Sequence, residues 1–386
     1  MAYGFPNADW MTGEHDQFAA SIDKFCAADV LPNSERWIGQ GDVDRDFWMK
    51  GGTAGLLGAS VDEEYGSVGA PRSFEALATY SYFRSGDSSW GFPIQNIVIH
   101  YVAQYGTEEQ KQRWLPGLVS GEIVAALGMT EPGTGSDVKA IATTALADGD
   151  DYVINGSKTF ITNGAQADVV CLACKTDPSA GYKGISLLMV DLGDLGGFSR
   201  GEPLKKIGMK GNGTSELFFN DCRVPRASLL GSGEGQGFYQ MMKQLPWERL
   251  GVALQALGVI DFAIEETLKY TKERKAFGKR IFDFQNTRFK LAEASTHAEV
   301  LRSFLADCIG RLDRGELDAT AASMAKWWST QLQNDVVDEC VQLFGGYGFM
   351  HEYPVARLYG DSRVQKIYAG TNEIMKELIA RSMDDD

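Results

Sequence analysis

The spacing of apolar residues divides the chain into three regions with different predicted structures. Residues 1–125 and 234–386 carry apolar side chains at every third or fourth position, which is typical of amphipathic helices. Residues 126–233 instead contain short apolar runs separated by turn residues, which indicates β-strands. The pattern therefore predicts an α+β protein with an N-terminal helical domain, a middle β domain and a C-terminal helical domain.

One position in the middle region carries a strong turn signal. Asn155-Gly156 lies between two apolar runs, and this dipeptide readily adopts the positive φ angles of a tight hairpin turn. We therefore predict a hairpin at this point. Alternate residues of the following strand share a face, so Phe160 and Thr162 are predicted to face one ligand together.

Two helix boundaries are marked in the C-terminal region. A helix around Asn334–Leu343 is predicted to end at Gly345-Gly346, because glycine commonly terminates helices. Thr371 is a good N-cap residue for a last helix that continues to about Arg381.

Composition narrows the functional classes. The 386 residues include 37 Lys and Arg against 52 Asp and Glu, which gives a net charge of −15. Nucleic-acid binding needs a basic face, so we expect no nucleic-acid partner. No apolar run approaches the roughly 18 residues that a membrane span requires, so we expect no span. The N-terminus shows no basic segment followed by an apolar one, as a secretory signal would.

The sequence shows no clear metal motif. Its four histidines have no metal-binding spacing. Cys171 and Cys174 form a CxxC pattern, but they lie in a predicted strand, where residues three apart point to opposite faces. We expect both to be structural and expect no metal site. Phosphate-binding loops of the P-loop type and GxSxG elbows are also missing from the sequence.

Four sequence blocks stand out: Ala126–Asp137, Asn155–Gly164, Glu273–Gly278 with Gln285, and Gln342–Phe349. They resemble blocks of the acyl-CoA dehydrogenases and follow the order of that family. The resemblance covers essentially the whole chain. The resemblance implies an N-terminal helical domain, a middle β-barrel or sandwich and a C-terminal four-helix bundle. It also implies FAD between the β domain and the C-terminal helices, with a neighbouring subunit completing the site.

The match to the family assigns a set of residues to FAD. They are Leu127, Met129, Thr130, Gly135, Ser136, Phe160, Thr162, Arg274, Phe277, Gln285, Gln342, Gly345, Gly346 and Thr371. Their chemistry is suitable, because hydroxyl groups and glycine-rich backbone bind flavin edges and phosphates, and a cation such as Arg274 suits a diphosphate.

Several of these residues also have structural interpretations. Thr130 and its glycines could form an ordinary loop, and Phe160 could belong to the β core. Arg274 could be a cation favoured at a helix C-terminus, and Gly345 and Gly346 could simply end a helix.

The family's base is a carboxylate that removes the α-proton of the acyl thioester. Many members place it before Gly-Thr, where this chain has Ala369, which cannot accept a proton. A second family pattern, found in the isovaleryl-CoA and long-chain branches, places a Glu before Arg-Leu, and Glu248 matches it. Apolar neighbours such as Pro246 and Trp247 would raise the pKa of Glu248. The alternatives are a solvated helix Glu at this position and Glu373 as the base.

The match also assigns residues to the substrate: Ser136, Arg249, Tyr368, Ala369 and Gly370. In the family, a main-chain N–H at the Ala369 position and a ribityl hydroxyl of FAD hold the thioester oxygen. Three lysines could meet phosphates of the acyl carrier or form a solvated basic loop: Lys205, Lys206 and Lys210.

The implied reaction is FAD-dependent α,β-dehydrogenation of an acyl-CoA to a trans-2-enoyl-CoA, with an electron-transfer flavoprotein as electron acceptor. Two alternatives are an acyl-CoA oxidase and a non-catalytic paralogue that binds flavin or a carrier-bound acyl thioester. The resemblance further implies a homotetramer. The N-terminus, which lacks an Arg-rich leader, favours the bacterial cytoplasm over the mitochondrial matrix.

Overall fold

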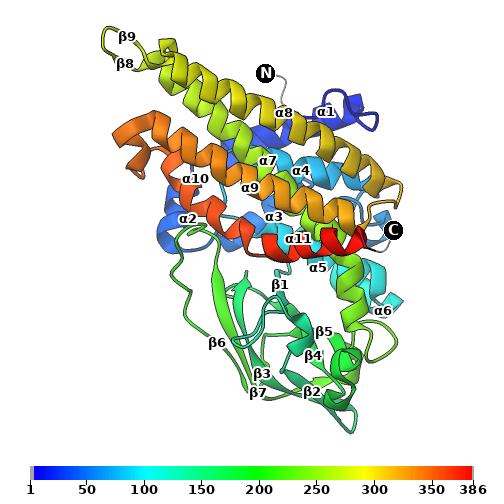
Figure 1. Cartoon of the computed structure of the whole chain (residues 1–386). Coiled ribbons are helices and arrows are strands. Elements are labelled where there is room, and N and C mark those ends of the chain that lie inside the picture. The colour runs from blue at the N-terminus through cyan, green and yellow to red at the C-terminus, as the bar shows by residue number, and fades with distance from the viewer. Residues whose placement is uncertain (1–3, 385–386) are drawn as a thin grey trace.

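The computed structural model describes residues 4–384. Along the chain, a helical region comes first, a β-sheet follows, and a second helical region comes last (Figure 1). The first region contains six α-helices within the described residues. They are α1 (Gly13–Phe25), α2 (Ser34–Gln40), α3 (Arg45–Thr53), α4 (Arg72–Arg84), α5 (Phe92–Tyr105) and α6 (Glu108–Ser120). The start of α6 is fixed by a capping box, in which Gln110 N donates to Thr107 Oγ1 and Thr107 N donates to Gln110 Oε1.

The middle region is one seven-stranded curled sheet with the path β1-β4-β2-β3-β7-β6, and β5 pairs with β4. The strands are β1 (Ala125–Gly128), β2 (Thr144–Asp148), β3 (Asp151–Thr162), β4 (Val169–Lys175), β5 (Ile185–Asp191), β6 (Phe198–Arg200) and β7 (Thr214–Pro225). β1 runs parallel to β4, and this pairing places Leu127 opposite Cys171.

The predicted hairpin at Asn155-Gly156 is wrong, because β3 passes through this dipeptide and pairs with β7 on both sides of it. A register shift between Ile154 and Gly156 marks a β-bulge, and Asn155 Nδ2 donates to Asp221 Oδ1 at 3.0 Å. The chain reverses instead at Gly149, whose φ is 63°, between β2 and β3. Cross-strand pairing therefore overrides the local turn preference.

A second register shift in β3, between Lys158 and Ile161, disturbs the predicted alternation of side chains. Phe160 lies within it and has a φ of 57°. Its ring is 69% exposed, whereas Ile161 is buried and Thr162 is partly exposed. The irregular backbone, and not regular alternation, therefore places Phe160 and Thr162 at the surface.

The C-terminal region contains three long helices, which follow one another along the chain, and two shorter helices. They are α7 (Gly237–Glu273), α8 (Gln285–Asp313), α9 (Ala319–Phe344), α10 (Pro354–Arg363) and α11 (Asn372–Ser382). The helices α10 and α11 both contact α9 and together take the place of a fourth long helix. The predicted helix end at Gly345 and the N-cap at Thr371 are confirmed, and Thr371 Oγ1 accepts from Ile374 N at 3.3 Å. A short hairpin, β8 (Lys275–Ala276) and β9 (Lys279–Arg280), joins α7 to α8.

The two helical regions share one hydrophobic core, and the sheet separates it from a second, smaller core. Cys171 belongs to the first core and Cys174 to the second, which confirms that the two thiols point to opposite faces. Buried polar contacts also join the helical regions. Asp261 on α7 accepts from Tyr80 on α4 at 2.6 Å and pairs with Arg302 on α8 at 2.8 Å.

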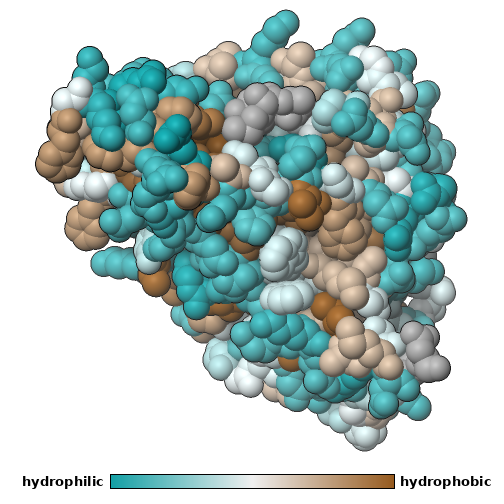
Figure 2. Space-filling model, turned by 45° about the horizontal axis from the view of Figure 1, so that its top comes forward, coloured by the Kyte–Doolittle hydropathy of each residue, from teal (hydrophilic) through white to brown (hydrophobic). Residues whose placement is uncertain are grey.

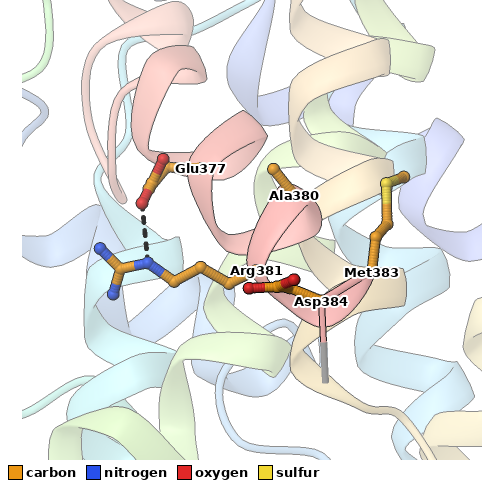
Figure 3. Close-up of a pocket in the computed structure, with 5 residues that line it drawn as sticks. All are labelled: Glu377, Ala380, Arg381, Met383 and Asp384. Carbon is orange, nitrogen blue, oxygen red and sulfur yellow. Dashed lines mark hydrogen bonds and ion pairs between the residues drawn. The ribbon is translucent and has the colours of Figure 1, made fainter. Parts of the chain in front are cut away.

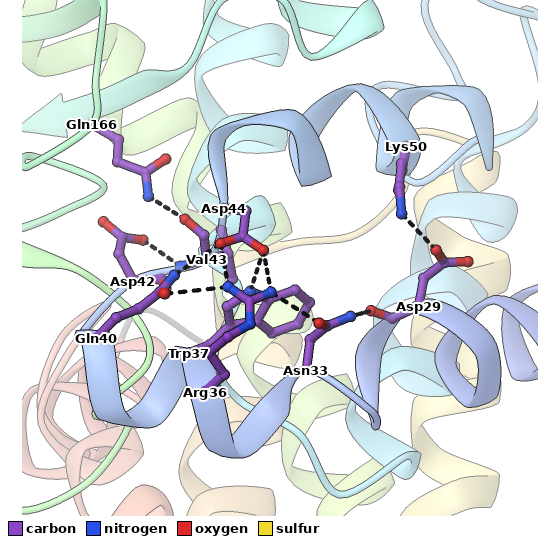
Figure 4. A network of polar contacts seen from close by, with 10 residues as sticks. All are labelled: Asp29, Asn33, Arg36, Trp37, Gln40, Asp42, Val43, Asp44, Lys50 and Gln166. Atoms are coloured by element: carbon purple, nitrogen blue, oxygen red, sulfur yellow. Dashed lines mark hydrogen bonds and ion pairs between the residues drawn. The ribbon is translucent and has the colours of Figure 1, made fainter.

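Polar contacts join the first helical region to the sheet region (Figure 4). Gln166, in the loop between β3 and β4, donates to the Val43 carbonyl and accepts from Trp48 Nε1 at 3.2 Å. Arg45 on α3 forms an ion pair with Asp168 in the same loop. These contacts fix the loop that follows Thr162.

Hydrophilic residues predominate on the face shown in Figure 2, where apolar residues form small groups between them. Among residues 4–384, no helix combines the length and apolar character needed to cross a bilayer. The same residues contain no cluster of three or more His, Cys, Asp or Glu side chains that could hold a metal ion.

Candidate active site

Glu248 lies in the interior, where α7, α5 and β4 meet. The residue is 7% exposed, and Glu248 Oε1 accepts a hydrogen bond of 3.1 Å from the buried Tyr101 hydroxyl of α5. Burial raises the pKa of the Cys171 thiol of β4, and the nearby charge of Glu248 raises it further. The interpretation of Glu248 as a solvated helix residue is therefore wrong.

Burial raises the pKa of Glu248 to about 7, while the Tyr101 hydrogen bond and the Arg249 guanidinium oppose the rise. Burial also raises the pKa of Tyr101 well above its usual value and that of Tyr105 to about 12. Both tyrosines are therefore neutral near pH 7. The site thus holds a carboxyl group whose pKa suits a general base at neutral pH.

The segment Tyr368–Gly370 runs beside α7 near Glu248. The Tyr368 hydroxyl donates to Gln255 Oε1 of α7 at 3.1 Å. A Cβ added to Gly370 would lie 3.9 Å from Nη2 of Arg249, so Arg249 borders this segment. The structure therefore brings together four of the predicted substrate residues, whereas Ser136 lies on a separate exposed loop.

Ala369 has a backbone conformation that suits a ligand-binding donor. Its φ is 53°, a left-handed value that an alanine rarely adopts. Within residues 4–384, its N–H group donates to no acceptor, and the residue is partly exposed. A free donor on a strained turn beside a buried carboxyl group can bind a carbonyl oxygen.

Several predicted flavin residues of the middle domain lie on two neighbouring segments of the sheet region. Thr159 N donates to the Thr130 carbonyl at 3.0 Å, so the loop after β1 lies beside Phe160 of β3. Leu127 and Met129 pack against the helical core, on the side of the sheet that contains Cys171. This places them on the side of the sheet where Glu248 lies.

An ion pair that the sequence did not indicate shapes this loop. Lys158 Nζ is fully buried and bonds to Glu131 Oε1 at 2.7 Å and to the Met129 carbonyl at 3.2 Å. Glu131 also accepts from the backbone N–H groups of Ala142 and Thr143. Both residues stand within the matched blocks, but nothing local in the sequence shows that they pair.

The other predicted FAD residues lie elsewhere in the chain. Arg274 contacts the ring of Tyr347 at 5.4 Å, next to Gly345 and Gly346, and Phe277 is 95% exposed at the tip of the β8–β9 hairpin. Figure 1 shows this hairpin at the opposite end of the molecule from the sheet. Gln285 and Gln342 are exposed at the start of α8 and near the end of α9, and Thr371 lies at the N-terminus of α11. One chain therefore does not bring all the predicted FAD residues to one place.

The residues present fit a flavin dinucleotide. No predicted FAD residue is buried, and within the described residues the hydroxyl groups of Thr130, Ser136 and Thr162 have no hydrogen-bond partner. Phe160 is exposed, so its interpretation as β core is wrong. Free hydroxyl donors beside an exposed aromatic ring are suited to a flavin edge.

Two other features lie outside this site. A pocket lined by Glu377, Ala380, Arg381, Met383 and Asp384 lies at the far end of α11 from Thr371 (Figure 3). The three lysines do not form one solvated cluster, because Lys206 points inward and donates to the Asn212 carbonyl and to Thr214 Oγ1. Lys205 and Lys210 are exposed.

Comparison with known proteins identifies the class. Family models match the acyl-CoA dehydrogenase N-terminal domain at residues 12–122, the middle domain at 126–222 and the C-terminal domain at 235–383. The chain is 45% identical to the long-chain specific acyl-CoA dehydrogenase, mitochondrial, of Sus scrofa, over 96% of this chain and 87% of that protein. It therefore belongs to the acyl-CoA dehydrogenase family and is a flavoprotein oxidoreductase that acts on acyl-CoA.

Solved structures agree with this assignment. An acyl-CoA dehydrogenase from Geobacillus kaustophilus is 46% identical and superposes with a TM-score of 0.95, covering 98% of this chain and 100% of that chain. A glutaryl-CoA dehydrogenase from Mycobacterium smegmatis in complex with FADH2 is 28% identical, with a TM-score of 0.91 and coverage of 97% and 96%. The predicted family and its three-domain architecture are confirmed.

Proposed function

We propose that this protein dehydrogenates long-chain acyl-CoA thioesters to trans-2-enoyl-CoA, with Glu248 as the base that removes the α-proton. The observation that carries the proposal is the buried Glu248 carboxyl group, whose pKa is raised to about 7. The long-chain preference is supported by the similarity to the Sus scrofa enzyme. Ala369 lacks a carboxylate, so Glu248 supplies the group that the family reaction needs.

In the proposed mechanism, Glu248 and the Ala369 N–H act on the thioester in the same step, beside the bound FAD. The ionised Glu248 carboxylate takes the α-proton, and the free Ala369 N–H binds the thioester oxygen, where negative charge develops. Bound FAD would supply the acceptor for the hydrogen and electron pair that leave the β-carbon. Tyr368 and Arg249 border the substrate beside Gly370.

We propose that FAD lies against Leu127, Met129, Thr130, Phe160 and Thr162, with Gly135 and Ser136 toward its phosphates. Thr371, the N-cap residue of α11, would contact it from the C-terminal domain. Arg274, Phe277, Gln285, Gln342, Gly345 and Gly346 would then contact the FAD of a second copy. Support comes from the position of the β8–β9 hairpin at the opposite end of the molecule from the sheet (Figure 1). A homotetramer in a bacterial cytoplasm and an electron-transfer flavoprotein as electron acceptor complete the proposal.

The test of the base is the Glu248→Gln variant. Glutamine keeps the shape of the side chain but cannot accept the proton, so we expect a folded, yellow protein that loses about 10³-fold or more in turnover. Glu265→Gln is the matched control, because Glu265 is an exposed glutamate on the same helix. Glu373→Gln tests the other candidate base, which is exposed on α11.

Near-normal turnover by Glu248→Gln would refute the assignment of the base. A second variant tests the location of the reacting carbon. Because position 369 carries the base in many relatives, the double variant Glu248→Gln with Ala369→Glu is expected to recover part of the activity. Recovery would place the α-carbon between positions 248 and 369.

A further inference from the structure

Lys326 of α9 is a fully buried lysine directly behind the Ala369–Gly370 turn. Its Nζ donates to the Gly370 carbonyl at 2.7 Å and to Asn372 Oδ1 at 3.0 Å. Thr330 Oγ1, one turn further along α9, donates to the same Asn372 oxygen at 3.0 Å. The contacts join α9 to both sides of the N-cap residue Thr371.

The turn that Lys326 holds has an unfavourable backbone. Ala369 and Gly370 have φ angles of 53° and 89°, and a left-handed alanine persists only when its surroundings enforce it. A Cβ at Gly370 would approach Met375 Cε to 2.6 Å, so the turn is also tightly packed against α11. Lys326 supplies hydrogen bonds at the point where the chain leaves this turn.

Stability alone gives little reason for a lysine at this position. Within residues 4–384, the partners of Lys326 Nζ are an amide carbonyl and an amide side chain, and it forms no salt bridge. Burial and then the Arg249 guanidinium disfavour its charge, whereas the smaller effect of the Glu373 carboxylate favours it. A buried lysine that forms no ion pair is costly, and an apolar side chain of similar length is usually tolerated better. The groups that Lys326 does contact all belong to the segment that contains Ala369.

We propose that Lys326 is a positioning residue, which fixes the Ala369–Gly370 turn so that the Ala369 N–H points at the thioester oxygen. Lys326 itself touches no substrate and acts through the Gly370 carbonyl and Asn372. The inference rests on the proposed function, because it needs the thioester to lie beside Ala369. It adds a residue from α9 whose effect is polarisation of the carbonyl and not proton removal.

The experiment uses FAD-loaded Lys326→Met and the infrared stretch of a bound trans-2-enoyl-CoA labelled with ¹³C at the thioester carbonyl. Hydrogen bonding lowers this frequency, so it reports on the donor directly. In the wild-type protein we expect a frequency below that of the free ligand. In Lys326→Met we expect a return toward the free value, with about a tenfold or greater loss of kcat/KM. Lys376→Met is the control, because Lys376 is an exposed lysine on α11.

An unchanged carbonyl frequency in folded, FAD-loaded Lys326→Met would overturn the proposal. If that variant does not fold, Asn372→Ala decides, since it removes one of the two acceptors of Lys326, and an unchanged frequency there would also overturn it. If the wild-type protein itself does not lower the frequency, the failure lies in the proposed position of the thioester and not in the role of Lys326.

Discussion

From the hydrogen bond between Tyr101 and Glu248 we predict how the rate of the reaction depends on pH. Tyr101→Phe removes the hydroxyl that donates to Glu248 Oε1 at 3.1 Å and leaves the ring in place. This hydrogen bond stabilises the ionised carboxylate, so its loss raises the pKa of Glu248 above the wild-type value of about 7. The base is active when ionised, so activity is lost as the pH falls through this pKa.

The size of the effect follows from the charge on the acceptor. A hydrogen bond to a charged group contributes about 1.5–3 kcal/mol, and 1.36 kcal/mol corresponds to one pH unit. We therefore expect the acidic limb of the pH profile to move upward by about one to two pH units. With a pKa of about 7, the wild-type carboxyl group is roughly nine-tenths ionised at pH 8. In the variant, about half to nine-tenths of the carboxyl group would be protonated at that pH.

The assay is anaerobic stopped-flow reduction of the bound flavin by an acyl-CoA, measured from pH 6 to 10. Tyr105→Phe is the matched control, because its hydroxyl donates to the Gln240 carbonyl at 3.3 Å and not to Glu248. Lys326, whose pKa is lowered to about 7 by burial and Arg249, also titrates in this range. The titration of Lys326 contributes equally to the wild type and to Tyr101→Phe. The difference between the pH profiles of these two proteins therefore reports on Tyr101 alone. An acidic limb that stays within about 0.3 pH units of the wild type would refute this reasoning.

Three further variants test the structural account. Lys158→Met leaves Glu131 buried without its partner, so we expect a loss of about 3–5 kcal/mol in the free energy of unfolding, measured in urea, together with weaker FAD binding measured by dialysis. Asp261→Ala removes the buried carboxylate that pairs with Arg302 and leaves this buried guanidinium only the exposed Glu299 as an ionic partner. It is expected to cost up to about 3–5 kcal/mol without a specific effect on FAD, and equal FAD losses in both variants would contradict this distinction. Phe277→Ala removes a ring that is 95% exposed in one chain, so FAD retention should fall while the unfolding transition of the apoprotein stays unchanged. An FAD affinity equal to that of the wild type would contradict the contact with a second copy.

The sequence predicted the features that depend on local signals. The spacing of apolar residues separated the helical regions from the sheet region, and Gly345 and Thr371 marked helix ends that the structure confirms. The opposite orientations of Cys171 and Cys174 followed from strand geometry alone. These features are set by neighbouring residues, so no long-range contact is needed to predict them.

Contacts between distant parts of the chain could not be predicted in this way. Asn155-Gly156 favours a turn, but pairing with β7 keeps it in a bulged strand. Tyr101 reaches Glu248 across 147 positions of sequence, and Lys326 reaches Gly370 across 44. The resemblance to the family gave the candidate residues, whereas the partners that set their pKa and orientation come only from the folded chain.

An anaerobic titration of the purified protein with straight and branched acyl-CoA thioesters, followed by flavin absorbance, tests the proposed reaction. We expect long straight-chain acyl-CoA to bleach the wild-type flavin, while Glu248→Gln stays yellow in the same titration. A yellow wild-type protein that no acyl-CoA bleaches would contradict the proposed reaction and favour a carrier-bound substrate or a binding role. A protein that takes up no FAD would contradict the cofactor assignment.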